Sequence, residues 1–167
     1  HQRNIFSIGG TYKRYWMPLE FVNAIALLKK HGIFAKLISP QEAEAFAGNE
    51  RARFFVTTTP IDLWQCPPLS IPQHFLQFCR KIASQSELYI CGYHGTLCPE
   101  LILQNTGAQA VIRGEPEETI RQICNDIALD EIRGVTFQKG NKIISQSDQP
   151  PIDLTKLATP AYEQVDF

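Results

Sequence analysis

Short apolar runs alternate along the chain with stretches whose apolar residues recur about every three to four positions, the period of an amphipathic helix. The runs lie at residues 5–8, 33–38, 53–59, 88–91 and 109–112. Runs of this length that end at glycine, proline or serine are typical of buried strands. The periodic stretches predict helices over residues 18–32, 41–47, 75–82, 99–105 and 116–129. Strands that alternate with helices predict βαβ units, and therefore a parallel sheet of five strands covered by helices on both faces.

The end of the chain departs from this alternation. Residues 134–138 and 142–146 flank Lys139-Gly140-Asn141, which is typical of a β-hairpin. Residues 148–167 are proline-containing and lack a clear period. We therefore predict a flavodoxin-like (Rossmann-like), doubly wound α/β domain over residues 1–131, a small C-terminal β-hairpin extension over 132–147 and a linker over 148–167.

Charge is unevenly spread over the 167 residues, although 16 basic and 17 acidic side chains give a net charge of only -1. So small a net charge gives no reason to expect a nucleic-acid partner. Residues 54–112 hold only five charged side chains, which are Asp62, Arg80, Lys81, Glu87 and Glu100. Central strands account for part of this, and cover by a ligand or partner for the rest. No apolar run approaches the roughly 20 residues that span a bilayer, so no membrane span is expected.

The cysteines bear on compartment and on metal binding. Five cysteines, an odd number without a C-x-x-C pair, favour a reducing cytoplasm over a disulfide scaffold. Cys91, His94 and Cys98 have a spacing that zinc sites use, but a structural zinc takes four ligands and no fourth is evident. A small buried residue is the favoured interpretation of Cys91. The chain begins at a histidine, and nothing in its first stretch reads as a signal peptide, so we expect it to be a piece of a longer protein or a tagged chain.

Four loops follow predicted strands and should meet at one edge of the sheet, where ligands bind in doubly wound folds. They are Gly9-Gly10-Thr11-Tyr12, Thr57-Thr58-Thr59-Pro60, Gly92-Tyr93-His94-Gly95-Thr96 and Gly114-Glu115-Pro116-Glu117. Glycines let a bulky ligand approach the backbone, and hydroxyls form hydrogen bonds with it. The same residues are common in any turn, so a purely structural role stays open for each loop.

Several known ligand sites of this architecture do not fit these loops. The residues after the first strand lack the G-x-G-x-x-G of a dinucleotide site. Only Ser7 and Thr11 could serve an FMN phosphate there, and only Asp62 could serve as the strand-end aspartate of a receiver domain. The chain has no P-loop, nucleophile elbow or iron–sulfur cysteine motif. A self-contained small α/β enzyme is therefore disfavoured.

Three ordered motifs carry a resemblance to a known family. They are C-G-Y-H-G-T at residues 91–96, P-E-L at 99–101 and V-I-R-G-E-P-E-E-T at 111–119. They resemble the G-G-P-H-A-T, P-E and V-x-R-G-E-x-E-x-T motifs of the N-terminal cobalamin-binding domain of cobalamin-dependent radical S-adenosylmethionine (SAM) enzymes. Pro18-Leu19 ahead of Lys30-His31-Gly32, the hairpin around Gly140 and residues 150–162 resemble further parts of that domain. The resemblance extends over nearly the whole chain.

The resemblance implies that the loops surround the nucleotide tail and one face of the corrin ring of cobalamin. The contact residues would be Gly9, Gly10, Thr11, Thr57, Thr58, Thr59, Gly92, Tyr93, His94, Gly95, Thr96, Gly114 and Glu115. Gly92 and Gly95 would permit close approach, the threonines would bond the tail, and Gly114 and Glu115 would flank the tail or the corrin amides. A 4Fe-4S cluster, SAM and the small-molecule substrate would belong to a separate radical SAM domain, the expected partner.

The sequence also departs from the family pattern. Tyr93 stands where the family usually has proline, and Cys91 where it often has glycine. The D-x-H-x-x-G motif of other cobalamin domains is absent after the first strand, which implies base-off cobalamin without a protein histidine below the cobalt. A loop-stabilising hydrogen bond is favoured over cobalt ligation for His94. Two hypotheses follow: a cobalamin-binding module of a methyl-transferring, rearranging or cyclising enzyme, or a module that has lost cobalamin and only packs on the catalytic barrel.

Overall fold

The structure is a computed structural model of the chain, and it describes residues 4–8, 18–49, 52–59 and 71–165. The strands are β1 (Asn4–Ile8), β2 (Ala35–Ile38), β3 (Ala52–Thr57), β4 (Glu87–Cys91), β5 (Ala110–Ile112), β6 (Val135–Lys139) and β7 (Lys142–Ser145). The α-helices are α1 (Leu19–Lys30), α2 (Pro40–Phe46), α4 (Gln73–Ala83), α5 (Tyr93–Leu97), α6 (Pro99–Thr106) and α7 (Glu117–Cys124). Two 3-10 turns follow, η1 (Leu154–Lys156) and η2 (Tyr162–Gln164).

The described strands form one sheet in the order β2-β1-β3-β4-β5-β6-β7. Neighbouring strands are parallel from β2 to β5, whereas β5–β6 and β6–β7 pair antiparallel. The order 2-1-3-4-5 is that of flavodoxin-like folds. The predicted α/β architecture with a mostly parallel core is therefore confirmed, and the sheet as a whole is mixed because β6 continues it beyond β5.

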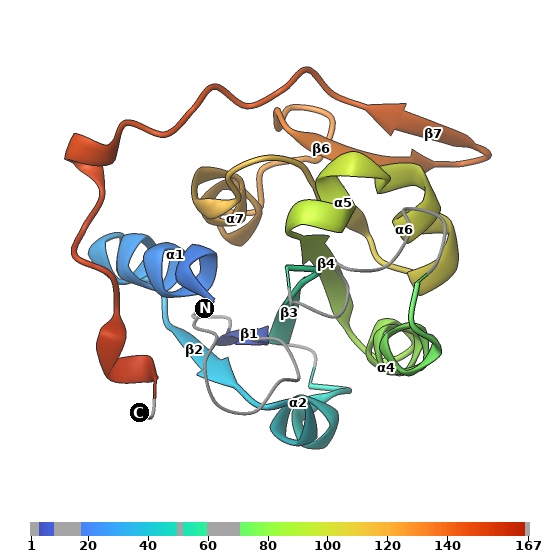
Figure 1. Ribbon diagram of the computed structural model, residues 1–167, viewed down its shortest axis with the longest axis horizontal. Helices are drawn as coiled ribbons and strands as arrows, with labels where there is room; N and C mark the ends of the chain where they lie inside the picture. Colours follow the sequence, from blue (N-terminus) through green and yellow to red (C-terminus); the bar gives the residue numbers. More distant parts are fainter. Residues whose placement is uncertain (1–3, 9–17, 50–51, 60–70, 166–167) are drawn as a thin grey trace.

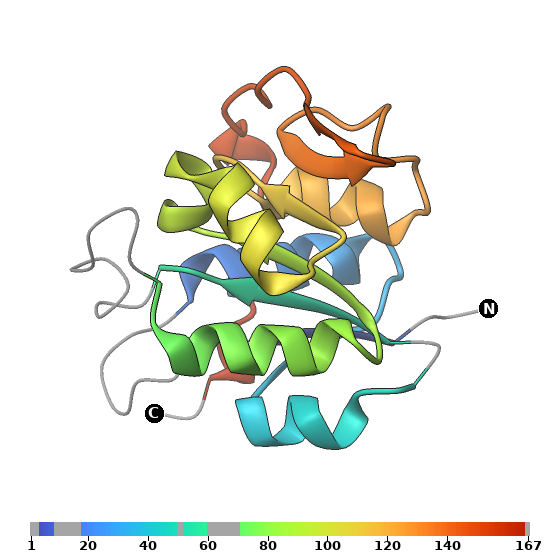
Figure 2. The same ribbon diagram turned by 90° about the vertical axis from the view of Figure 1, so that its right-hand side faces the viewer.

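Helices cover both faces of this sheet (Figures 1 and 2). All six residues of β3 are buried, as expected for a central strand covered on both sides. Phe54 and Val56 pack with residues of α2, α4 and α6, whereas Phe55 packs with residues of α1 and α7. This division follows from the two-residue repeat of a strand, which sends successive side chains to opposite faces.

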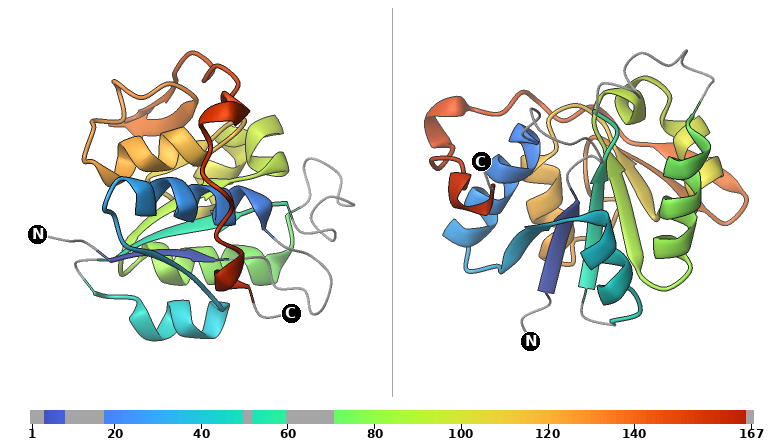
Figure 3. Two further views of the ribbon diagram at one scale, coloured as in Figure 1. Left: turned by 90° about the vertical axis from the view of Figure 1, so that its left-hand side faces the viewer. Right: turned by 60° about the horizontal axis from the view of Figure 1, so that its bottom comes forward.

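The described part of the segment predicted as a linker, residues 148–165, crosses α1 (Figure 3, left). Ala161 N donates to Val22 O at 3.0 Å, and the Ala161 side chain is buried against Ile25 and Ala26. Lys29 on α1 forms an exposed ion pair with Glu163 at 3.2 Å. Apart from η1 and η2, the described part of this segment is irregular, so it forms a strap across the outer face of α1.

Two helix predictions are wrong in detail. Residues 93–97, predicted as a loop, form α5, in which Thr96 N donates to Gly92 O and Cys98 N donates to His94 O. The last helix ends at Cys124 rather than at residue 129, because Asp126 adopts the left-handed φ of 60° and breaks the helical repeat. Among the described residues, we find no helix of the length and apolarity that crossing a membrane requires.

Candidate functional site

The carboxyl ends of β3, β4 and β5 bring most of the predicted loop residues together. Thr57 ends β3, Cys91 ends β4 and Ile112 ends β5, and the parallel pairing places these ends along one edge. Thr58 N donates to Cys91 O at 2.9 Å, which joins the loop after β3 to the end of β4. The predicted residues Gly9, Gly10 and Thr11 lie outside the described residues.

The threonine hydroxyls tie the loops to one another. The Thr57 hydroxyl donates to Glu20 Oε1 at 2.7 Å. The Thr58 hydroxyl donates to Cys91 O at 2.9 Å and accepts from Gly95 N at 3.0 Å. The Thr96 hydroxyl donates to Gly92 O and accepts from Gly114 N, both at 3.0 Å. Because a hydroxyl has a single proton to donate, these three groups use their donors within the protein.

The two loop glycines differ in what surrounds them. A Cβ at Gly92, where φ is 95°, would lie 2.6 Å from Thr57 Oγ1 and 2.8 Å from Thr58 N. Gly92 is therefore needed for close packing of one loop on another. At Gly114, where φ is 71°, no atom of the described residues lies within 4 Å of an added Cβ. Of these two glycines, Gly114 faces open space.

A pocket of about 430 Å³ lies at this edge of the sheet. It is lined by Leu19, Glu20, Asn23, Thr59, Gly92, Tyr93, Thr96, Gly114, Glu115, Pro116 and Glu117. Six of the predicted site residues are in this set, whereas Thr57, Thr58, His94 and Gly95 are buried and are not. Leu19 and Tyr93 are about half exposed (49% and 51%), so the pocket has an apolar rim.

Three of the lining residues come from a place that the sequence did not indicate. Leu19, Glu20 and Asn23 lie in the first turns of α1, whose periodicity reveals only which residues face the core. The Pro18-Leu19 motif was a signal for this region, but it carried no assignment of side chains to a site. Glu117 lies in the V-I-R-G-E-P-E-E-T motif and in one of the four predicted loops, but it was not among the predicted contact residues.

Glu117 is the most perturbed acid of the pocket. Glu117 is only 5% exposed, and Asn23 Nδ2 donates to Glu117 Oε1 at 3.3 Å. Its Oε2 is buried and has no hydrogen-bond partner. Burial raises the pKa of Glu117, and the nearby charges of Glu115 and Glu20 raise it further, against the opposing hydrogen bonds. Burial, with Glu20 and Glu117 nearby, likewise raises the pKa of the Cys91 thiol well above its usual value.

His94 lies on α5 and is not among the residues that line the pocket at the sheet edge. It is 4% exposed, and its Nε2 is buried without a hydrogen-bond partner. No group of three or more His, Cys, Asp or Glu side chains converges on a possible metal position within the described parts of the chain. The spacing of Cys91, His94 and Cys98 therefore does not translate into a three-ligand set there.

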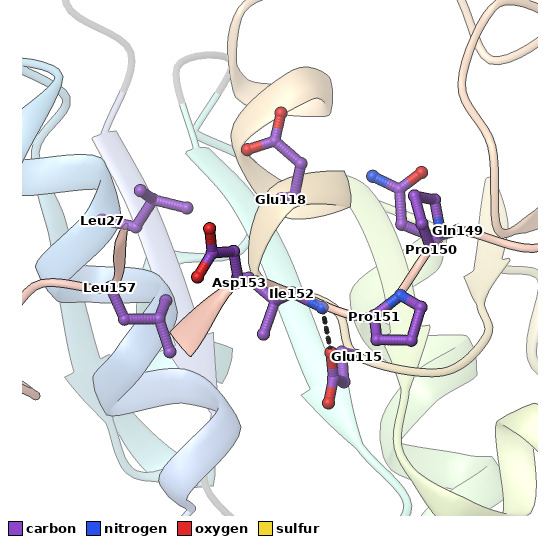
Figure 4. Close-up of a pocket in the computed structure, with 9 residues that line it drawn as sticks. All are labelled: Leu27, Glu115, Glu118, Gln149, Pro150, Pro151, Ile152, Asp153 and Leu157. Carbon is purple, nitrogen blue, oxygen red and sulfur yellow. Dashed lines mark hydrogen bonds between the residues drawn. The ribbon is translucent and has the colours of Figure 1, made fainter. Parts of the chain in front are cut away.

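Glu115 lies between this pocket and a second one. The second pocket, of about 260 Å³, is formed by Leu27, Glu115, Glu118, residues 149–153 and Leu157 (Figure 4). Ile152 N donates to Glu115 Oε2 at 2.6 Å. One oxygen of the Glu115 carboxylate is thus bound to the C-terminal segment, while Glu115 also lines the pocket at the sheet edge.

No family model matches this sequence, and no curated protein sequence matches it either. Among solved structures, the chain is similar to the radical SAM methyltransferase TsrM from Kitasatospora setae with cobalamin and a [4Fe-4S] cluster bound. The TM-score is 0.68 at 13% identity, over 99% of this chain and 34% of that chain. It is also similar to the cobalamin-dependent SAM radical enzyme OxsB with aqua-cobalamin and SAM bound. There the TM-score is 0.75 at 11% identity, over 96% of this chain and 24% of that chain.

The match covers nearly all of this chain but only about a quarter to a third of each enzyme. At sequence identities this low, the structural similarity establishes a shared fold and nothing more. The structural neighbours are the enzymes that the sequence motifs led us to expect, and at the level of fold that resemblance is confirmed. The chain is folded like one portion of radical SAM enzymes whose structures contain cobalamin.

Proposed function

We propose that this chain is the cobalamin-binding module of a radical SAM enzyme that transfers methyl groups or rearranges or cyclises its substrate. The observation that carries the proposal is the pocket at the carboxyl edge of the sheet, built from the motif residues in a fold shared with cobalamin-bound enzymes. When bound, cobalamin supplies cobalt chemistry, and the protein binds and orients it.

The residues of the pocket suit one part of cobalamin better than another. The corrin ring has primary amides around its edge, whereas the tail carries a phosphate. The pocket is lined by Glu20, Glu115 and Glu117, and the negative charges of Glu20 and Glu115 disfavour a phosphate there. About 430 Å³ holds a small ligand or the edge of a large one. The pocket therefore fits the amide-bearing edge of the corrin, and the exposed rings and chains of Leu19, Tyr93 and Leu97 offer apolar cover beside it.

We propose distinct roles for the loop residues. Those that line the pocket would contact the cofactor: Thr59, Gly92, Tyr93, Thr96, Gly114 and Glu115. Thr57, Thr58 and Gly95 would position the loops through their internal contacts. Gly9, Gly10 and Thr11 would complete the site. His94, buried and outside the set that lines the pocket, would stay off the cobalt, in keeping with base-off binding.

The proposal extends to the parent protein. Residues 1–131 would form the cobalamin-binding domain, 132–147 its β-hairpin extension and 148–167 the path toward a radical SAM domain. That domain would hold the 4Fe-4S cluster and SAM and would be the partner of this module. The module alone would not turn over substrate.

A second function is favoured by a specific observation. The hydroxyls of Thr57, Thr58 and Thr96 are engaged within the protein, and Tyr93 stands exposed at the mouth of the pocket. A module that had lost cobalamin would keep these loop contacts and could place the Tyr93 ring in the vacated space. Such a module would act only by packing on its catalytic partner.

Reconstitution separates the two functions. The purified chain is incubated with hydroxocobalamin, desalted and examined by visible spectroscopy. We expect a retained corrinoid with base-off bands, in the wild type and in His94→Ala. If both the chain and the full-length parent emerge colourless, the module has lost its cofactor and the proposal is wrong.

Two glycines provide a matched pair of variants for this experiment. Gly114 (φ 71°) and Gly140 (φ 60°) are both left-handed, and no atom lies within 4 Å of an added Cβ at either. Leucine at either position costs about 1–2 kcal/mol of backbone strain. Only Gly114 lines the pocket, so Gly114→Leu should lose the corrinoid whereas Gly140→Leu should retain it. Equal retention by the two variants would place the cofactor away from this pocket.

A further inference from the structure

The pocket contains a buried polar atom whose hydrogen-bonding capacity is unused. Glu117 Oε2 has no hydrogen-bond partner among the described residues, and Glu117 is 95% buried. Such atoms are rare in folded proteins, because leaving a buried polar group unpaired costs about 1–3 kcal/mol. Glu117 lines the pocket at the sheet edge, which is where a ligand could supply the missing partner.

Burial, and after it the charges around Glu117, favour the protonated form of its carboxyl group. Glu20 of α1 and Glu115 of the preceding loop face it with negative charge, and the Cys91 thiol of β4 lies nearby. No lysine, arginine or histidine is among the described residues that line the pocket. The neighbouring cation on α7, Arg121, is held by Glu118 at 2.8 Å. With no cation among these lining residues to offset them, the negative charges add to the effect of burial and raise the pKa of Glu117.

The position of that proton follows from the hydrogen bond to Asn23. Asn23 Nδ2 donates to Oε1, which must therefore act as an acceptor. The proton then belongs on Oε2, the atom without a partner. In its protonated form Glu117 presents a donor toward a missing acceptor. Glu20 complements it, because Thr57 engages its Oε1 and no described residue engages its second oxygen, which can therefore accept.

We propose that protonated Glu117 and the carboxylate oxygens of Glu20 together recognise a primary carboxamide of the ligand. Glu117 Oε2 donates to the amide carbonyl, and Glu20 accepts from the amide N–H. This inference rests on the proposed function. In bound cobalamin, Glu117 and Glu20 would contact one of the amides at the edge of the corrin ring.

Other ligand classes satisfy the pair less well. A metal ion would need a converging set of ligands, and none is found among the described residues. A phosphate or carboxylate would be repelled by Glu20 and Glu115. An apolar group would leave Oε2 unpaired. A primary amide supplies one acceptor and two donors on a single planar group, which matches one protonated and one ionised carboxyl.

The test compares the pH profile of hydroxocobalamin binding in the wild type, Glu117→Gln and Glu117→Leu. Wild-type affinity should fall as pH rises through the pKa of Glu117, because deprotonation removes the donor. Glu117→Gln keeps a donor at every pH, so its affinity should match the wild type at mildly acidic pH and should not fall with increasing pH. Glu117→Leu should bind about tenfold more weakly, the loss of one buried hydrogen bond. A merely structural Glu117 would leave the three pH profiles parallel, which would overturn the inference.

A second ligand series keeps the test decisive if Glu117→Leu does not fold. Hydroxocobalamin monocarboxylic acids carry a carboxylate in place of one peripheral amide. One isomer should bind the wild type at least about tenfold more weakly than hydroxocobalamin does, because its carboxylate would be repelled by Glu20 and has no N–H to donate to it. Equal affinity for every isomer would overturn the inference while leaving cobalamin binding intact.

A small amide probe distinguishes failure of cobalamin binding from failure of amide recognition by Glu117 and Glu20. Propionamide is titrated into the labelled chain, and the side-chain amide resonances of Asn23 are followed by NMR in the wild type and Glu117→Leu. Saturable shifts in the wild type alone would support recognition of an amide even if no corrinoid binds. If neither propionamide nor hydroxocobalamin perturbs Asn23, the inference is wrong.

Discussion

Two buried ionisable side chains lie at opposite ends of the same sheet, and their surroundings differ. Arg53, near the amino end of β3, is 6% exposed and donates to Glu87 Oε2 at 2.6 Å, to Ile123 O at 2.5 Å and to Asp126. Glu117, beyond the carboxyl end of β5, has one partner at 3.3 Å and one unpartnered oxygen. The amino end is closed by internal bonds, whereas the carboxyl end retains unmet hydrogen-bonding capacity. Unmet capacity beside a pocket is a mark of ligand binding.

Electrostatics reinforce this contrast. Burial acts to lower the pKa of Arg53, but the carboxylates of Asp126 and Glu87 outweigh it and raise that pKa. The ionised form of Arg53 is therefore the stable one. At the other end burial, Glu115 and Glu20 all raise the pKa of Glu117 and favour its neutral form. The fold thus keeps a charge where it serves structure and suppresses one where the pocket lies.

Removing the Arg53 guanidinium should have the largest effect on stability. Arg53→Met keeps the aliphatic stem but loses three hydrogen-bond partners, one of them the buried carbonyl of Ile123. We expect a loss of about 3 kcal/mol in the free energy of unfolding, measured by urea denaturation. The affinity of the folded variant for hydroxocobalamin should be unchanged. An equally large loss of affinity would show that the two ends of the sheet are coupled.

The amino end was easier to anticipate from the sequence than the carboxyl end. The strand that contains Arg53 was predicted from its aromatic and β-branched residues, a local signal. The place of Glu20 and Asn23 depends on where α1 starts relative to β3 and α7. Asn23 and Glu117 are 94 residues apart in sequence, and no local pattern connects them. Helix α5 was missed because five residues are too few to display a period.

The loops also show that a local sequence pattern does not identify the partners of a side chain. The loops of the site were located from the sequence, but the threonine hydroxyls were assigned to a ligand, and the structure shows three of them bonded within the protein. Gly92 and Gly114 look alike in the sequence, although only Gly114 faces open space. Residue type indicates which hydrogen bonds and close contacts are possible. The partner is decided by tertiary packing.

Glu117→Gln should sharpen the contrast through the pH dependence of stability. The raised pKa of Glu117 stabilises the fold fully below the ordinary carboxyl pKa, and this stabilisation is lost as pH rises through the raised value. Glutamine has no proton to lose. In the absence of ligand, the variant should therefore become more stable than the wild type at alkaline pH, by about 1 kcal/mol. Urea midpoints measured across the pH range test this, and parallel profiles for the two proteins would show that Glu117 is already ionised.

The smallest expected effect concerns Asp126, one of the three partners of Arg53. Asp126 has a left-handed backbone with φ of 60°, which asparagine tolerates better than most residues, so Asp126→Asn removes the charge without disturbing the turn. Because its carboxylate is 59% exposed and Glu87 and Ile123 O remain, we expect a loss of only about 0.5 kcal/mol. Asp126→Ala should cost about 1 kcal/mol more, from backbone strain alone. If Asp126→Asn were instead as damaging as Arg53→Met, the ion pair with Asp126 would account for the whole contribution of Arg53. Glu87 and Ile123 O would then add little to stability, and the amino end would not be held by several bonds.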